Sequence, residues 1–252
     1  MAKKGDWVRI HKIILKPEER TGKLPEDTQA VPLEMWTKGY LLADAEIGDE
    51  VEIESVNGSN RYRNALAPGT RTVCMVKADA YGAGALETGR TLQECNADYL
   101  AVAVADEGAE LRKEGIITGI IVMNPEPCSY RTLFDNKLEP EVYSFGMLDS
   151  LIKAACREGI TDYPVHIKID TGMGRVGFVS KDSDSMNDAK YACYLKNLIP
   201  YGVFTHFAVA DEATDGYEYT KRQYDAFIHT VDTLKEYGVE FEVTHCSNSG
   251  AI

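Results

Sequence analysis

The stretch Thr72-Val-Cys-Met-Val-Lys-Ala-Asp-Ala-Tyr-Gly-Ala-Gly84 leads from an apolar run, through a single lysine, into a glycine-containing turn. Residues 73–76 are continuously apolar, which is typical of a strand buried on both faces in a parallel sheet. An ammonium at the end of such a strand is costly to desolvate unless it is paired or has a lowered pKa, and an imine-forming lysine requires a lowered pKa. Lys77 is therefore a candidate nucleophile. The alternative is a strand-end lysine that reaches back to solvent.

The alternation of strand and helix continues from residue 66 onward. We expect strands at residues 72–77, 98–104, 119–124, 138–144, 163–170 and 201–208, with a last strand and turn at 241–250. The expected helices lie between them, at residues 85–95, 106–114, 131–136, 147–155, 186–198 and 217–237. Seven strands with intervening helices predict an α/β fold with a parallel sheet. An incomplete (β/α)8 TIM-type barrel, with seven of its eight strands, is the expected form, and a doubly wound open sheet is the alternative.

The first 58 residues follow another pattern. Both tryptophans, Trp7 and Trp36, lie there, whereas all six cysteines follow residue 73. Apolar residues that alternate with acids over residues 46–56, and an apolar run over residues 5–15, predict a short β-rich segment. Asn57-Gly58 is a hairpin turn signal, yet no returning strand follows it. The split predicts two pieces of different origin.

Composition and charge narrow the class of protein. The net charge is −13 with no basic block, which argues against nucleic acid as a partner. No apolar run approaches the roughly 20 residues of a membrane helix, and the N-terminus lacks the apolar core of a signal peptide, so we expect a cytoplasmic protein without a membrane partner. The cysteines form no Cys-x-x-Cys pair, which predicts reduced, mostly buried thiols and no metal site.

Polar side chains follow four of the expected strands, at the end where a βα barrel carries its chemistry. They are Lys77 and Tyr81 after the first strand, Lys168, Asp170 and Arg175 after the fifth, His206 after the sixth, and Asn248 and Ser249 after the seventh. Together they predict a site for an anionic, aldehyde-bearing cofactor. Simpler interpretations remain, because Asp170 can cap the following turn and a histidine can belong to the core, which we favour for His245.

Four motifs resemble, in order and spacing, the signatures of bacterial alanine racemases. They are Val76-Lys-Ala-Asp-Ala-Tyr-Gly, His166-Ile-Lys-Ile-Asp-Thr-Gly-Met-Gly-Arg-Val-Gly-Phe, Phe204-Thr-His-Phe-Ala-Val-Ala-Asp and His245-Cys-Ser-Asn-Ser. The resemblance covers residues 59–252. It implies a pyridoxal 5'-phosphate barrel that interconverts L-alanine and D-alanine, and a homodimer in the intact family.

The resemblance also implies a role for each matching residue. Lys77 would form the internal aldimine and act as a catalytic base, and two bases on opposite faces of the cofactor would exchange the proton of the substrate α-carbon. Arg175 would reach the pyridine hydroxyl near the substrate carboxylate. Lys168 corresponds to a lysine that is carbamylated in some members and orients that arginine. The other residues implied to contact the cofactor are Tyr81 and Ser249 at its phosphate, Asn248 beside them, and His206 near its ring.

The sequence departs from the family in several places. In the family the second base is a tyrosine of the partner subunit's C-terminal β domain, and the arginine at the pyridine nitrogen belongs to the eighth strand. We expect both to lie beyond residue 252. Ala83 stands where many members have histidine. We therefore expect this chain to be able to bind the cofactor but to be inactive alone.

Residues 1–58 resemble a second family, the small subunit of 2-amino-4-ketopentanoate thiolase. The similar stretches are Gly5-Asp-Trp-Val-Arg-Ile-His-Lys, Pro25-Glu-Asp-Thr, Val31-Pro-Leu-Glu-Met-Trp-Thr-Lys-Gly and Gly48-Asp-Glu-Val-Glu-Ile. The two resemblances predict two truncated genes joined near residue 58, giving segments 1–58 and 59–252. Two alternatives stay open. One is a non-catalytic module that docks on a thiolase large subunit, and the other is a different racemase or a decarboxylase of the same barrel class.

Overall fold

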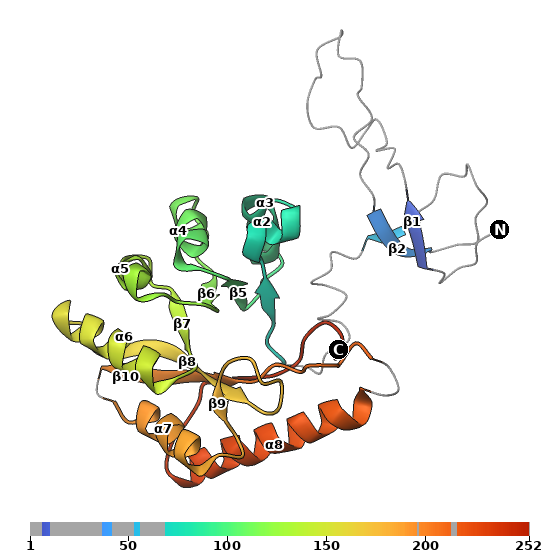
Figure 1. Cartoon of the computed structure of the whole chain (residues 1–252). Coiled ribbons are helices and arrows are strands. Elements are labelled where there is room, and N and C mark those ends of the chain that lie inside the picture. The colour runs from blue at the N-terminus through green and yellow to red at the C-terminus, as the bar shows by residue number, and fades with distance from the viewer. Residues whose placement is uncertain are drawn as a thin grey trace. The chain divides into compact units, whose positions relative to one another are not determined.

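The computed structural model describes residues 7–10, 37–41, 53–55, 69–195, 197–212 and 216–251. The chain divides into two compact units, Met1–Asn64 and Ala65–Ile252. The described part of the first unit is an antiparallel sheet in the order β1 (Trp7–Ile10), β2 (Thr37–Leu41), β3 (Ile53–Ser55) (Figure 1). This is the expected β-rich segment. The hairpin signal at residues 57–58 lies outside the described residues.

The second unit is built on parallel strands that follow one another in chain order. The described strands on this path are β4 (Val73–Met75), β5 (Tyr99–Val102), β6 (Gly119–Val122), β7 (Glu139–Val142), β8 (Tyr163–Asp170), β10 (Leu198–Phe204) and β11 (Val243–His245). Each pairs in parallel with the next. A doubly wound sheet would reverse its strand order at a switch point, so that alternative is wrong. The expected seven strands of an incomplete TIM-type barrel are confirmed.

Helices cover the outer side of the curled sheet (Figure 1). They are α3 (Ala85–Glu94), α4 (Ala105–Lys113), α5 (Tyr130–Asp135), α6 (Phe145–Arg157), α7 (Ser183–Cys193) and α8 (Tyr217–Glu236), with a short 3₁₀ turn, η2 (Pro127–Ser129), before α5. In α6, the Ser144 hydroxyl caps the first turn by accepting from the Met147 amide. Leu148 and Leu151 lie on the buried face that this helix turns toward the sheet.

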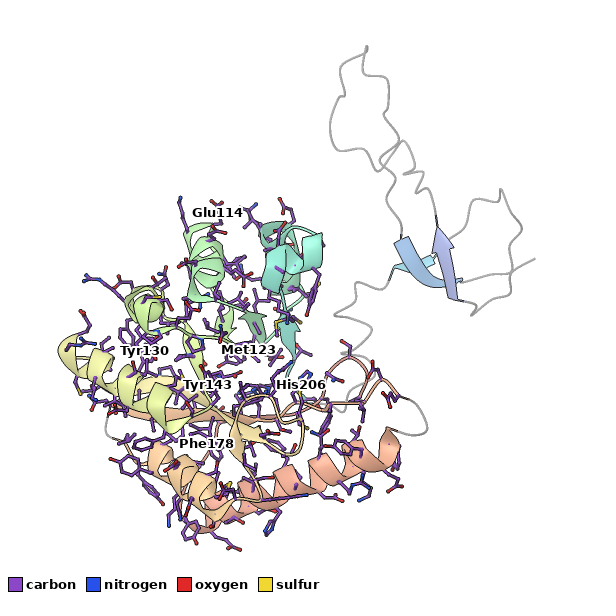
Figure 2. All side chains as sticks on the ribbon, in the orientation of Figure 1. Glu114, Met123, Tyr130, Tyr143, Phe178 and His206 are labelled. Atoms are coloured by element: carbon purple, nitrogen blue, oxygen red, sulfur yellow. The ribbon has the colours of Figure 1, made fainter. Side chains whose placement is uncertain are left out.

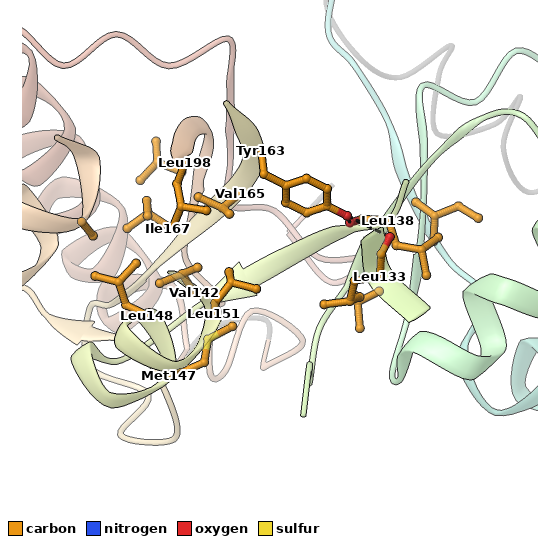
Figure 3. Close-up of a cluster of buried hydrophobic side chains, with 14 of the residues drawn as sticks. Leu133, Leu138, Val142, Met147, Leu148, Leu151, Tyr163, Val165, Ile167 and Leu198 are labelled. Carbon is orange, nitrogen blue, oxygen red and sulfur yellow. Dashed lines mark hydrogen bonds between the residues drawn. The ribbon is translucent and has the colours of Figure 1, made fainter. Parts of the chain in front are cut away.

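The two faces of the sheet differ in chemistry because alternate residues of a strand point to opposite sides. The outward residues join the helices in the main core, part of which is shown in Figure 3 around Val142, Leu151 and Ile167. The Tyr163 hydroxyl lies 2.9 Å from the Leu133 carbonyl oxygen and 2.6 Å from the Leu138 carbonyl oxygen in this cluster. The inward face has a small apolar cluster of buried residues, namely Tyr99, Ala101, Ile121 and Val243.

The inward face of the central strands is polar. Along β8 the outward residues Val165, Ile167 and Ile169 alternate with His166, Lys168 and Asp170. The neighbouring strand β7 places Glu141 opposite His166 in the ladder register. The fold therefore gathers ionisable side chains inside the curl of the sheet.

The structure corrects some expected elements. A helix was expected at residues 186–198. Helix α7 instead ends at Cys193, and β10 already begins at Leu198. The reason is that Asn197 is tied to the start of β8, because its carbonyl accepts from the Tyr163 amide and its side chain donates to the Ile160 carbonyl. A two-residue strand, β9 (Phe178–Val179), pairs with β8 and was not expected.

The expectation for the cysteines is partly wrong. All six cysteines lie in the described residues, but of the six only Cys193 is buried. Cys128 and Cys156 are exposed. None of the helices in the described residues is long and apolar enough to cross a membrane. The same residues contain no cluster of histidine, cysteine or acidic side chains suited to a metal ion.

Candidate active site

Lys77 begins a turn of unusual handedness. The segment α2 (Lys77–Gly82) contains four consecutive residues, 78–81, whose φ angles lie between 51° and 58°. Residues with a side chain normally enter this left-handed region singly, at roughly 1–2 kcal/mol each. Backbone strain of this kind collects at functional sites. Sequence reasoning missed this turn, because it expected only a glycine-containing turn after the lysine and residues 78–81 include no glycine.

Two carboxylates hold this turn by accepting hydrogen bonds from backbone amides. The Asp79 side chain accepts from the Ala85 amide at 2.6 Å, and Glu107 of α4 accepts from the Ala78 amide at 2.7 Å. The Lys77 side chain is half-buried, and its Nζ lies 5.9 Å from the ring centre of the exposed Tyr81. The lysine is thus presented at the carboxyl end of β4, as expected, on a backbone fixed from both sides.

Lys168 and Glu141 are buried together on the inward face of β8 and β7. Burial lowers the pKa of Lys168 to about 8, an effect that the charge of Glu141 opposes and that of Arg175 increases. Burial raises the pKa of Glu141 to about 7, against the positive charges of Lys168 and Arg175. The Lys168 ammonium also lies 4.1 Å from the ring centre of Phe204 on β10. Two buried groups therefore titrate near neutral pH. Sequence reasoning missed Glu141, because nothing in the sequence distinguishes this buried glutamate from a charged strand residue that faces solvent.

Asp170 caps the glycine-rich turn that follows β8. Its carboxylate accepts from the Gly172 amide at 2.9 Å and from the Gly174 amide at 3.0 and 3.1 Å. The simpler interpretation of this residue is confirmed. Gly177 is required here, because its φ is +131° and a Cβ would lie 2.7 Å from the Asp170 amide nitrogen. Arg175 is exposed on the same turn.

His206 lies half-buried on the loop after β10 (Figure 2). Its pKa is lowered by burial and, to smaller extents, by the positive charges of Lys168, Arg175 and Lys77. Since these three charges all act on one imidazole, the structure brings the four residues into one region. The lowered pKa keeps His206 neutral at pH 7.

The buried amide of Gln223 on α8 holds the His206 loop in place. It donates to the His206 carbonyl at 3.2 Å and to the Thr171 hydroxyl at 3.3 Å, and its oxygen accepts from the Ala208 amide at 2.9 Å. The loops after β8 and β10 are thereby joined. Gln223 carried no signal in the sequence, because a glutamine on an amphipathic helix is ordinary.

Asn248 joins the loop after β11 to the loop after β10. Its side chain donates to the Phe207 carbonyl at 3.2 Å and accepts from the Gly250 amide at 3.1 Å. Ser249 is exposed beside it. His245 stacks on Phe204 with ring centres 4.6 Å apart, and its buried Nε2 has no hydrogen-bond partner. Burial lowers the pKa of His245 to about 3, so this residue packs as a neutral core histidine, as favoured.

The residues present fit an anionic cofactor that carries an aldehyde. Lys77, Lys168 and Arg175 bring positive charge to one region, as their common effect on His206 shows. An anion is stabilised by such charges, and a lysine presented on a rigid backbone is suited to imine chemistry. Hydroxyl groups of Tyr81 and Ser249 stand exposed at the ends of the first and last strands, where they are open to a phosphate.

Comparisons with known proteins identify a family for each unit of the chain. Residues 59–252 match the family model of the alanine racemase N-terminal domain, and residues 1–66 match that of the AKP thiolase subunit OrtA. The alanine racemase of Clostridium tetani is 35% identical over 204 residues, which are 81% of this chain and 52% of that protein. The chain spans about half the length of the curated relatives it matches.

Solved structures give the same result. The alanine racemase of Clostridium difficile 630 in complex with cycloserine superposes with a TM-score of 0.72 at 36% identity, over 77% of this chain and 52% of that one. That of Streptomyces lavendulae superposes with a TM-score of 0.68 at 32% identity, over 76% and 50%. With these matches added to its sequential parallel strands and its lysine-bearing turn, the chain belongs, through residues 59–252, to the alanine racemase family.

Proposed function

We propose that the barrel unit takes part in the pyridoxal phosphate-dependent interconversion of L-alanine and D-alanine. The observation that carries the proposal is the gathering of Lys77, Lys168, Arg175 and His206 at the carboxyl ends of the strands. Bound pyridoxal phosphate supplies an electron sink that acidifies the α-carbon proton of an amino acid. The residues of this chain would hold the reactants and move that proton.

Each residue has a distinct part in this proposal. Lys77 would hold the cofactor covalently through Nζ. When the amino group of the substrate replaces Nζ on the cofactor, the freed amine of Lys77 would take or return the α-carbon proton. Arg175, exposed on its turn, binds the anionic side of the reactants, and Lys168 adds a second positive charge behind it. His206 packs near the cofactor ring without adding charge, because it is neutral. The hydroxyls of Tyr81 and Ser249, with Asn248 fixing their surroundings, receive the phosphate.

The assignment of Lys77 is tested with the purified chain and added pyridoxal phosphate. We expect a visible absorbance band of the lysine-bound cofactor, and borohydride reduction should leave the label on the peptide that contains residue 77. Lys77→Ala should lose both signals, whereas Lys181→Ala, which removes an exposed lysine outside the site, should keep them. A band of undiminished strength in Lys77→Ala would contradict the proposal.

The number of bases is tested by proton exchange. Lys77 is the one base that we assign among the described residues, and it can act on one face of the α-carbon. We therefore expect the chain alone to exchange the α-proton of one alanine enantiomer with deuterated water faster than it inverts that enantiomer. Proton NMR follows the exchange and chiral chromatography follows the inversion. Inversion as fast as exchange would show that a second base is present.

The match of residues 1–66 to a thiolase subunit favours a second function. We propose that this segment docks on a large subunit of 2-amino-4-ketopentanoate thiolase. The full chain and the purified large subunit should then elute together in size-exclusion chromatography. Separate elution over a range of concentrations would rule out docking and leave the barrel function unaffected.

A further inference from the structure

Glu107, in the first turn of α4, holds two separate backbone segments with one carboxylate. Its Oε1 accepts from the Ala78 amide at 2.7 Å, directly after Lys77. Its Oε2 accepts from the Ala103 amide at 2.7 Å and, more weakly, from the Val104 amide at 3.4 Å. One oxygen therefore serves the turn after β4, and the other serves the loop after β5.

The Ala78 amide needs this acceptor because of the left-handed turn. The last ladder bond beside β4 runs from the Val76 amide to the Ala101 carbonyl, at 2.8 Å. Two residues later the chain has left the sheet, and Ala78 is the first of the four residues with positive φ. A carboxylate is a stronger acceptor for a backbone amide than a neutral oxygen, so Glu107 stabilises the backbone at the point where the strain begins.

Helix α4 is a rigid base for this contact. Ala105 and Leu111 are buried against the sheet, and Gly108 packs so closely that a Cβ would lie 2.9 Å from the Leu138 side chain. A glutamate in the first turn is also favoured by the helix dipole. The carboxylate is thus carried by a fixed helix and anchored to the loop after β5 through the Ala103 amide, and it holds Ala78 relative to β5.

A simpler role for Glu107 is that of a capping residue for its own helix. Such a role needs a bond to the amide of the residue preceding the helix, and that bond, to Val104, is the longest of the three at 3.4 Å. The short bonds go to Ala103 and, across 29 residues of sequence, to Ala78. The geometry is that of a tie between two loops.

We propose that Glu107 is a positioning residue that holds the left-handed turn so that Lys77 faces the cofactor. The inference rests on the proposed function of Lys77. Without the carboxylate, the Ala78 amide loses its partner and the strained turn relaxes toward ordinary backbone angles. Lys77 then leaves the position in which its amine meets the aldehyde.

Glu107→Gln is the informative variant. The glutamine keeps the size of the side chain, but its NH₂ group cannot accept from an amide, so one of the two short bonds is lost. Glu110→Gln is the matched control, because Glu110 is an exposed carboxylate on the same helix. Glu107→Asp tests rescue, since it keeps both oxygens on a shorter side chain.

The measurements are the rate of formation of the visible band with pyridoxal phosphate and its dependence on pH, together with the midpoint of thermal unfolding. We expect Glu107→Gln to form the band at least about tenfold more slowly at temperatures where it is fully folded, since a charge-assisted hydrogen bond is lost. Glu107→Asp should recover part of the rate, and Glu110→Gln should match the wild type. A Glu107→Gln variant with the wild-type rate and pH profile overturns the proposal.

A wild-type chain that forms no band at Lys77 would instead refute the proposed function. Amide hydrogen exchange of residues 76–85, measured by mass spectrometry, then decides whether Glu107 holds the turn. Faster exchange in Glu107→Gln than in Glu110→Gln supports the tie. Equal amide exchange rates in the two variants would show that Glu107 does not hold the turn.

Discussion

In the pair Lys168 and Glu141, both side chains are buried, which is true of no other pair of opposite charges in the described barrel. Motif positions in the sequence predicted that Lys77, Lys168, Arg175 and His206 belong to one site. They could not predict Glu141, Glu107 or Gln223, because these residues act through contacts between strands or helices that are distant in the chain. A single sequence carries no record of which side chain of the next strand faces a given lysine.

The buried pair predicts how stability depends on pH. Glu141 has a folded pKa of about 7 against an ordinary 4.5, so between these values the folded chain holds a proton that the unfolded chain has lost, and stability falls as pH rises. Lys168 has a folded pKa of about 8 against an ordinary 10.5, so stability rises with pH over that window. The contribution of these two groups is therefore least favourable between pH 7 and 8.

Urea unfolding at a series of pH values checks this prediction. Glu141→Gln should remove the fall between pH 4.5 and 7, and Lys168→Met should remove the rise between pH 8 and 10.5, each relative to the wild type. Glu141→Gln should also lower the pKa of Lys168 further, because the charge of Glu141 opposes the effect of burial. Glu158→Gln, at an exposed carboxylate, should leave the curve unchanged. If the curves of stability against pH for Glu141→Gln and Lys168→Met both superimpose on that of the wild type, the two groups are hydrated in the folded chain and the prediction is wrong.

At the scale of elements, periodicity predicted most strands and helices to within a few residues. The β8 strand was predicted with both its ends, because Val165, Ile167 and Ile169 alternate with polar residues. The left-handed turn after β4 was not predictable, since residues 78–81 include no glycine and residues with a side chain normally enter the left-handed region singly. Contacts with α4 and α3 decide that backbone.

The contact between β8 and β10 depends on Gly202. A Cβ there would lie 2.1 Å from Nδ1 of His166, whose ring is fully buried and whose Nε2 lies 2.8 Å from the Glu139 carboxylate. The ring has no free space, so we expect Gly202→Ala to lower the free energy of unfolding by about 1–3 kcal/mol or more.

Gly146→Ala is the control for this substitution. Gly146 lies in α6 with no atom within 4 Å of an added Cβ, and alanine there should raise stability by about 0.5–1 kcal/mol because it favours the helix. Both values come from urea unfolding at one pH. If the Gly202→Ala variant and the wild type have equal free energies of unfolding, β8 and β10 can move apart around the added methyl group at no cost in stability, and the prediction is wrong.

At the scale of the whole barrel unit, the sheet has two edges. Among the described strands, β4 pairs only with β5, and β11 pairs only with β10. Unpaired strand edges invite pairing with another chain. We expect the purified chain to associate as its concentration rises, which light scattering measures.

Placing a charge on one edge tests this expectation. Thr244→Lys puts a lysine at an exposed position of β11 and should reduce the association, because a charged edge resists strand pairing. Thr161→Lys, at an exposed position before β8, adds the same charge away from both edges and should have no effect. Equal association of the two variants would locate the contact elsewhere.

The ion pair between Arg71 and Glu242 bears on the order in which the barrel unit folds. It joins the residues just before the first and last strands of the barrel unit, with 2.8 Å between Arg71 Nη2 and Glu242 Oε1. Every strand pairing on the sheet path joins a strand to the next strand of that path along the chain, and so closes only a short loop. The barrel unit can therefore grow one strand and helix at a time during synthesis, whereas this ion pair, whose partners are 171 residues apart in sequence, forms only after the ribosome has delivered the last strand.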